Sequence, residues 1–266
     1  MKNIFSGALV LVFSVFLLGC QPKSNSHTIN IGTMAGPESS IMEAAAQVAQ
    51  EKYGLTVNIT QFSDYTMPNR ALHDGDIDAN MFQTIPYLNA DMTANDYDFV
   101  VIGKTFIYPM AIYSNKIKNI NQTPKGAIVT IPNDPSNQAR ALILLQKAGL
   151  ITLKPGVDVM ATPNDIASNP KQLKIQPLDA ATLSRTLPDV TMAVINTNYA
   201  ILARLYPTKN SIFMEGTDSP YVNIVVVRNG EQNEAKFKEL MMALHSQPVL
   251  DAANKLFQGQ AIPGWN

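Results

Sequence analysis

Predicted strands and helices alternate along most of this chain. Residues 29–31 begin a strand, residues 38–53 carry apolar side chains at helical spacing, and residues 55–59 alternate apolar and polar side chains as a strand does. A second unit follows, with a strand at 127–131 and a helix at 135–148. Chains with this alternation fold into α/β sheets that carry helices on both faces.

The remaining predicted elements indicate two lobes. Further strands are expected at 99–103, 107–113, 173–175, 191–195 and 222–227, and further helices at 180–187, 234–244 and 248–257. Long apolar strands separate the two strand–helix units and a last strand returns near the C-terminus, so we expect the chain's end to complete the first lobe. With crossings near Pro109 and Val227, residues 29–109 and 228–266 form the first lobe and residues 110–227 the second.

An apolar run begins just after Lys2 and ends at Cys20, the only cysteine in the chain. One positive charge, an uncharged stretch over residues 4–18 and a small residue before the cysteine are typical of a bacterial lipoprotein signal. A membrane-spanning helix is the alternative, but the run is shorter than the ~20 residues that a span needs. We therefore expect residues 1–19 to be a signal peptide, Cys20 to be lipidated and residues 20–28 to tether the fold to the extracytoplasmic side of a membrane.

The composition limits how the folded part is stabilised and what it binds. With no cysteine beyond Cys20, the fold has neither an internal disulfide nor a thiolate metal cluster, so it depends on an apolar core. The formal net charge of −1, with 15% charged residues, gives no bulk attraction to nucleic acid.

The sequence contains no complete motif for metal binding or catalysis. His27, His73 and His245 lack metal-ligand spacing, and residues 74–85 imitate a calcium loop without its glycine and closing glutamate. The sequence also lacks the nucleophile, Walker and dinucleotide motifs. We therefore expect a binding protein without catalytic residues, metal or cofactor.

Several groups of motif residues occur in order and at consistent spacing along the chain. They are Phe62–Tyr65 with Pro68–Asn69, Gly75–Asn80, Phe82–Gln83 with Pro86–Leu88, Thr105–Pro109, Pro132–Pro135, Leu144–Lys147 with Gly149–Leu150, Ala193–Thr197 and Ser219–Asn223. In these stretches the chain resembles the MetQ/NlpA family of methionine-binding lipoproteins. The resemblance implies a two-lobed periplasmic-binding-protein fold of type 2 with its ligand cleft between the lobes, and a permease and an ATPase of an ABC importer as partners.

Arg140 is the best candidate for binding a ligand carboxylate. It lies one turn into the helix that is predicted to begin after Asp134, where backbone N–H groups are free. A guanidinium beside those groups can hold a carboxylate through two parallel hydrogen bonds. By resemblance, Arg140 corresponds to the family's carboxylate-binding arginine; an ordinary surface arginine is the alternative.

Asn196 and Asn223 are candidates for binding a ligand ammonium. Asn196 directly follows the strand at 191–195, and Asn223 lies at the start of the strand at 222–227. An amide oxygen can accept from the ammonium while its NH2 donates elsewhere, which adds no buried charge. Each residue could instead cap a helix or form a turn, but the resemblance implies ligand contact at both positions.

Aromatic residues of the first lobe are candidates for the side-chain pocket. They are Tyr65, Phe82, Tyr87, Phe106 and Tyr108. Such a wall suits a thioether, whose sulfur gains about 0.3–1.5 kcal/mol from contact with a ring. We expect one or two of these rings, Phe106 first, to be structural.

Two positions depart from the family pattern. Thr84 stands where a histidine is usual, and Ile112 stands where a small residue is usual. With threonine in place of histidine, the pocket lacks the flat face and the polar edge of an imidazole ring at this position. L-methionine is the first expectation for the ligand; another amino acid, a methionine derivative or a short peptide is the alternative, as is a surface adhesin that has kept the fold without transport.

Replacing Cys20 with serine is expected to abolish membrane anchoring and to leave ligand affinity unchanged. The lipid attaches at this residue, and a tether separates it from the predicted site. Cell fractionation measures the anchoring, and calorimetry with L-methionine measures the affinity. A fall in affinity would show that the anchor and the site are coupled.

Overall fold

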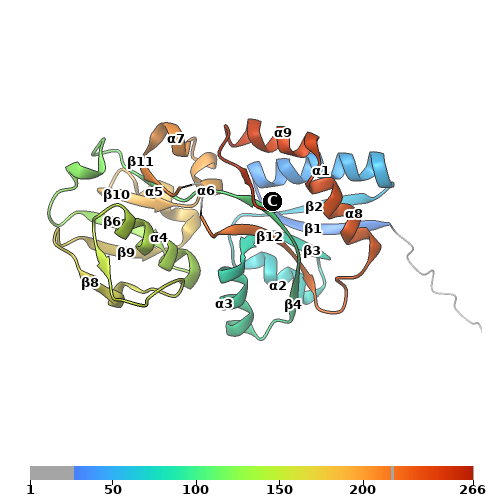
Figure 1. Cartoon of the computed structure of the whole chain (residues 1–266), viewed down its shortest axis with the longest axis horizontal. Coiled ribbons are helices and arrows are strands. Elements are labelled where there is room, and N and C mark those ends of the chain that lie inside the picture. Colours follow the sequence, from blue (N-terminus) through green and yellow to red (C-terminus); the bar gives the residue numbers. More distant parts are fainter. Residues whose placement is uncertain (1–26, 217–218, 266) are drawn as a thin grey trace, which may run out of the picture.

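The computed structural model describes residues 27–216 and 219–265, which form two α/β lobes (Figure 1). The fold class predicted from the sequence is confirmed. The predicted signal peptide, Cys20 and most of the tether lie outside the described residues, and Thr28, the last predicted tether residue, already belongs to the first strand. None of the helices within the described ranges is long and apolar enough to cross a membrane.

The first lobe is built on a six-stranded sheet with the order β13-β4-β12-β3-β1-β2. Its strands are β1 (Thr28–Met34), β2 (Thr56–Phe62), β3 (Ala79–Thr84), β4 (Phe99–Ile107), β12 (Val222–Arg228) and β13 (Ile262–Pro263). Helices α1 (Pro37–Tyr53), α8 (Ala235–Leu244) and α9 (Gln247–Leu256) cover one face, and α2 (Met67–Asp74) and α3 (Ile85–Asn95) cover the other (Figure 1).

Strand β12 shows why this sheet is buried on both faces. Val225 and Val227 pack in the core beneath α1, α8 and α9, whereas Ile224 and Val226 pack with residues of α2 and α3. A strand covered on both sides is apolar at successive positions instead of alternating. This explains the continuous apolar run in the sequence.

The second lobe is built on a five-stranded sheet with the order β11-β5-β10-β6-β9. Its strands are β5 (Ala111–Tyr113), β6 (Ile128–Pro132), β9 (Lys174–Leu178), β10 (Met192–Ile195) and β11 (Ser211–Met214), and β7 (Thr152–Leu153) pairs separately with β8 (Ile166–Ser168). The helices are α4 (Pro135–Lys147), α5 (Leu183–Thr186), α6 (Thr197–Leu202) and α7 (Pro207–Asn210), with 3-10 turns at Ile120–Gln122, Pro163–Asp165 and Ala180–Thr182. Leu142 and Leu145 of α4 pack on Val129 and Val194 of the sheet.

The first passage between the sheets is at Tyr108–Met110, between β4 and β5. Two strands were expected here, at 99–103 and 107–113, but β4 continues through residues 104–106 and the break comes at Pro109. Proline has no N–H to donate to a ladder, so a strand ends readily at this residue.

The second passage lies earlier than the sequence suggested. We expected it near Val227, but β12 pairs with both β3 and β4 of the first sheet, so the chain has returned before Val222. An apolar run indicates that a strand is buried on both faces, but it does not reveal which sheet the strand joins. Residues 222–227 therefore do not belong to the sheet of the second lobe.

A buried amide cluster ties α2 and α3 to β3. Asn69 Nδ2 donates to Gln83 Oε1 (2.9 Å) and to Asp91 Oδ2 (2.7 Å), and Asn69 Oδ1 accepts from Asn80 Nδ2 (2.9 Å) and Gln83 Nε2 (2.7 Å). Asn69, Asn80 and Gln83 are all buried. Because each side-chain atom of Asn69 has a partner, the cluster fixes the position of the strand that ends at Thr84.

The Asn69→Ala variant is expected to lower the free energy of unfolding by about 2–4 kcal/mol, because it removes the four hydrogen bonds of Asn69 and leaves Gln83 Oε1 buried without a partner. Denaturant titration measures this loss. The matched control is Asn89→Ala, at an exposed position of α3, for which we expect a change within about 0.5 kcal/mol. Equal effects of the two substitutions would contradict a structural role for the cluster.

Candidate ligand-binding site

A pocket lies between the two lobes beside the chain passages. It encloses about 380 Å³ of space outside the protein atoms, a figure that includes its open mouth. Every residue predicted to contact a ligand lines it: Tyr65, Phe82, Thr84, Tyr87, Tyr108, Arg140, Asn196 and Asn223. The prediction missed further lining residues, which are Glu38, Gln83, Asn137, Thr197 and Asn198.

The start of α4 positions one side of the pocket. Asp134 caps the helix, with its carboxylate accepting from Asn137 N (2.9 Å), as the sequence predicted. Asn137 Oδ1 in turn accepts from Asn196 Nδ2 (2.7 Å). Asn196 Oδ1 is buried and has no hydrogen-bond partner within the described part of the chain, so it is available as an acceptor.

The opposite side of the pocket is formed where β3 meets β12. Thr84 ends β3 and stands at the N-cap of α3, and in the sheet register it is the partner of Asn223. Asn223 is 6% exposed. Ile112 packs in the core of the second lobe, away from the residues that line the pocket, so this second departure from the family pattern does not alter the lining.

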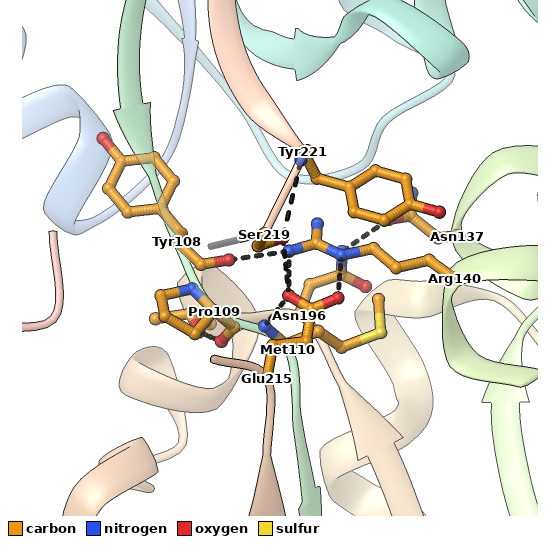
Figure 2. A network of polar contacts seen from close by, with 10 residues as sticks. Tyr108, Pro109, Met110, Asn137, Arg140, Asn196, Glu215, Ser219 and Tyr221 are labelled. Carbon is orange, nitrogen blue, oxygen red and sulfur yellow. Dashed lines mark hydrogen bonds and ion pairs between the residues drawn. The ribbon is translucent and has the colours of Figure 1, made fainter. Parts of the chain in front are cut away.

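Arg140 forms a buried ion pair with Glu215 (Figure 2). Arg140 Nε donates to Glu215 Oε1 (2.8 Å), and Arg140 Nη2 donates to Glu215 Oε2 (2.6 Å) and to the Tyr108 carbonyl (2.9 Å). The guanidinium carbon lies 4.5 Å from the centre of the Tyr221 ring. Burial alone lowers the pKa of Arg140, but the carboxylate of Glu215 outweighs it and the pKa is raised.

This pairing changes what Arg140 can offer. The sequence led us to expect a guanidinium with two nitrogens available to a ligand, but Nε and Nη2 are already engaged. Nη1 makes no hydrogen bond to any described residue, so it is the nitrogen left for a ligand in the pocket that Arg140 lines.

Glu215 also connects both passages between the lobes. It lies on the return passage, and its Oε2 accepts from Met110 N of the first passage (2.9 Å) and from the Ser219 hydroxyl (3.2 Å). The Thr197 hydroxyl, at the start of α6, donates to the Pro109 carbonyl. No sequence motif pointed to Glu215, because its partners are far away along the chain.

Four aromatic rings gather beside the polar part of the pocket. Tyr65, Phe82, Tyr87 and Tyr199 lie with neighbouring ring centroids 5.0 to 6.0 Å apart. The Tyr65 hydroxyl donates to Asn198 Oδ1 of the second lobe (2.7 Å). Burial raises the pKa of the Tyr65, Tyr87 and Tyr199 hydroxyls, so these groups are neutral.

Two of the predicted aromatic residues belong to the first-lobe core. Phe106 is fully buried and packs edge-on against Trp265, as expected of a structural ring. Tyr108 stacks on Phe257 with the ring centroids 4.4 Å apart. The Tyr108 hydroxyl is nevertheless buried without a partner in the described chain, and Tyr108 lines the pocket.

Glu38 is the carboxyl group that sequence reasoning missed. It is the second residue of α1, is 3% exposed and lines the pocket. Its Oε2 has no hydrogen-bond partner among the described residues. Burial raises the pKa of Glu38 to about 8. Its place directly after Pro37, at a predicted helix start, was the available signal.

The family follows from comparison with known proteins. The NlpA lipoprotein family matches residues 29–265. This chain belongs to that family. Both the family and the two-lobed fold predicted from the sequence are thereby confirmed.

Individual relatives cover nearly the whole chain. D-methionine-binding lipoprotein MetQ of Salmonella typhi is 46% identical over 264 residues, which are 98% of this chain and 97% of that protein. Among solved structures, a periplasmic substrate-binding protein of an ABC transporter from Coxiella burnetii is 56% identical, with a TM-score of 0.87, over 89% of this chain and 100% of that one. A nutrient-binding protein from Burkholderia cenocepacia, bound to methionine, is 46% identical with a TM-score of 0.87 and the same coverage.

In this NlpA-family protein, Glu215→Gln is expected to lower the free energy of unfolding by about 3–5 kcal/mol, because it leaves Arg140 buried without a counter-charge. The control is Glu231→Gln, which removes the charge from a partly exposed pair with Arg228 at 3.0 Å, against 2.6 Å for the buried pair. An exposed pair is worth at most about 1 kcal/mol. Urea denaturation of both variants measures the difference, and equal losses would contradict the structural importance of the buried pair.

Proposed function

We propose that this protein is the substrate-binding lipoprotein of an ABC importer, and that it captures methionine between its lobes. The observation that carries the proposal is the set of buried, unpartnered polar atoms beside a cluster of aromatic rings in one pocket. A free α-amino acid has a carboxylate, an ammonium and a side chain, and the pocket offers a matching group for each.

Donors are available for the carboxylate. Arg140 Nη1 is charged and unengaged within the described residues, and Asn198 Nδ2 is buried without a partner there. A hydrogen bond from a charged donor contributes about 1.5–3 kcal/mol, more than one from a neutral group. Together these nitrogens bind the carboxylate and fix the orientation of the ligand.

Acceptors and apolar surface serve the rest of the ligand. Asn196 Oδ1 and the side-chain amide oxygen of Asn223 accept from the ammonium. The rings of Tyr65, Phe82 and Tyr87 form the wall for the thioether, with which aromatic rings make favourable contacts.

Thr84 supports a second candidate ligand. It lines the pocket where the family usually has a histidine, so the wall beside the ligand side chain is less flat and less polar at this point. A methionine derivative or another amino acid with a differently shaped side chain fits such a change. The stereochemistry is open to the same test, since close relatives are named for D-methionine.

The remaining parts of the proposal concern location and partners. Cys20 anchors the protein to the extracytoplasmic side of the membrane, where the tether keeps it close to its permease and ATPase and so raises its local concentration. The residues that line the pocket include no nucleophile beside a general base, which favours capture and release over catalysis.

A thermal-shift panel tests this function. Ligand-stripped protein is expected to gain about 2.7 kcal/mol from methionine at one hundred times its Kd. The panel contains L- and D-methionine, methionine derivatives, the other amino acids and short peptides, and a rise for none of them would overturn the proposal. Asn223→Ala should weaken binding at least tenfold, whereas Asn229→Ala, at an exposed position, should leave it unchanged.

A further inference from the structure

Glu38 lines the pocket but has no role among the ligand contacts proposed above. It is the one carboxyl group among the described residues that line the pocket, and its Oε2 is buried without a partner there. No cation in the described part of the chain forms an ion pair with it. A buried ionised carboxylate without a partner is costly, so this arrangement requires either a bound proton or a cation from outside.

The neighbouring side chains supply no such cation. Tyr65, Tyr108 and Tyr199 face Glu38 from the β2–α2 connection, the end of β4 and α6, and burial raises the pKa of each hydroxyl, which keeps it neutral. Arg140 lines the same pocket, but its charge is balanced by Glu215.

The Met34 backbone donates a hydrogen bond to Glu38, which lowers its pKa less than burial raises it, and the other charged groups around α1 leave Glu38 without a counter-charge. Asp134 is occupied in capping α4. The charged residues of α8 and α9, the helices that pack on α1, are all at least partly exposed: Lys236, Lys238, Glu239, Asp251 and Lys255. The N-terminus of α1 contributes a partial positive charge, equivalent to about half a unit, which favours an anion at this position without neutralising it.

The ligand-free pocket therefore holds Glu38 mainly in its protonated form at neutral pH. With a pKa of about 8, the protonated form exceeds the ionised form about tenfold at pH 7. An ammonium that enters the pocket reverses this preference, because an opposite charge at close range favours the ionised carboxylate.

We propose that Glu38 binds the ammonium of the captured amino acid and releases its proton to solvent as it does so. The Glu38 O–H bond breaks, the proton passes to the buffer, and the carboxylate pairs with an ammonium that keeps all its protons. The inference rests on the proposed function, because it requires a ligand with an ammonium in this pocket. It makes Glu38 a specificity residue, which selects ligands that carry a positive amine.

Because binding releases a proton, the affinity for the ligand depends on pH. Binding favours the deprotonated carboxyl, so affinity rises with pH below the pKa of the free site and levels off above about 8. From pH 6 to pH 8 we expect the affinity for L-methionine to increase at least tenfold. The ligand ammonium stays protonated over this range and does not contribute to the change.

Isothermal titration calorimetry tests the inference on the ligand-stripped, full-length protein in detergent. L-methionine is titrated at pH 7 in phosphate and in imidazole, whose ionisation enthalpies differ. The dependence of the measured heat on the buffer gives the number of protons released. We expect close to one proton for the wild type and for Glu43→Gln, at an exposed position of the same helix, and none for Glu38→Gln.

A methionine analogue that lacks the amine provides a second test of the role of Glu38. Relative to L-methionine, 4-(methylsulfanyl)butanoate should bind the wild type at least tenfold more weakly, and this difference should shrink in Glu38→Gln. If L-methionine binds the wild type without releasing a proton, the inference is overturned and the proposed function stands. If no amino acid binds, both fail. The proton count of the wild type decides the question even if Glu38→Gln does not fold.

Discussion

The buried ion pair between Arg140 and Glu215 is the interaction on which the site depends. Arg140 comes from α4 of the second lobe, Glu215 lies on the return passage, and their further hydrogen bonds reach Tyr108 and Met110 of the first passage. Burying one of these charges alone would cost several kcal/mol, so the position of each residue specifies that of the other. The two passages and the start of α4 therefore meet at one point, and the pocket forms beside it.

Contacts away from this point hold the lobes together more weakly. The Tyr65 hydroxyl bonds to Asn198, the Tyr199 hydroxyl lies 3.4 Å from the Ser63 carbonyl, and an apolar cluster shared by both lobes includes Met34 and Phe82 from the first. If the lobes separate, each neutral hydrogen bond between them is replaced by hydrogen bonds to water, at a net cost of about 1 kcal/mol. The lobes are thus joined by a charged network at the passages and by neutral and apolar contacts away from them.

The sequence predicted those features that depend on local pattern. The alternation of strands and helices, the cap at Asp134 and the polar residues at strand ends follow from spacing and from motif resemblance. The partner of Arg140 could not be predicted from local spacing, because Glu215 is 75 residues away along the chain and belongs to no local pattern. Glu38 escaped notice for a related reason: an acidic residue in a first helical turn usually faces water, but here Tyr65, Tyr108 and Tyr199 lie beside it, and these residues are distant in the sequence. The sheet to which Val222–Arg228 belongs was likewise decided by long-range pairing.

The backbone explains why a pocket with acidic neighbours still suits a carboxylate. Helices α1, α3, α4 and α6 all begin at the pocket, where Glu38, Thr84, Asn137 and Asn196 line it. Free N–H groups make each helix start partly positive, and this favours anions there. With the charge of Arg140 balanced by Glu215, the attraction for a ligand carboxylate comes from several weak dipoles and two available nitrogens, Arg140 Nη1 and Asn198 Nδ2. A ligand ammonium is disfavoured by the same dipoles, so beside the amide oxygens of Asn196 and Asn223 a fixed anion strengthens its binding, and Glu38 is the carboxyl group that lines the pocket there.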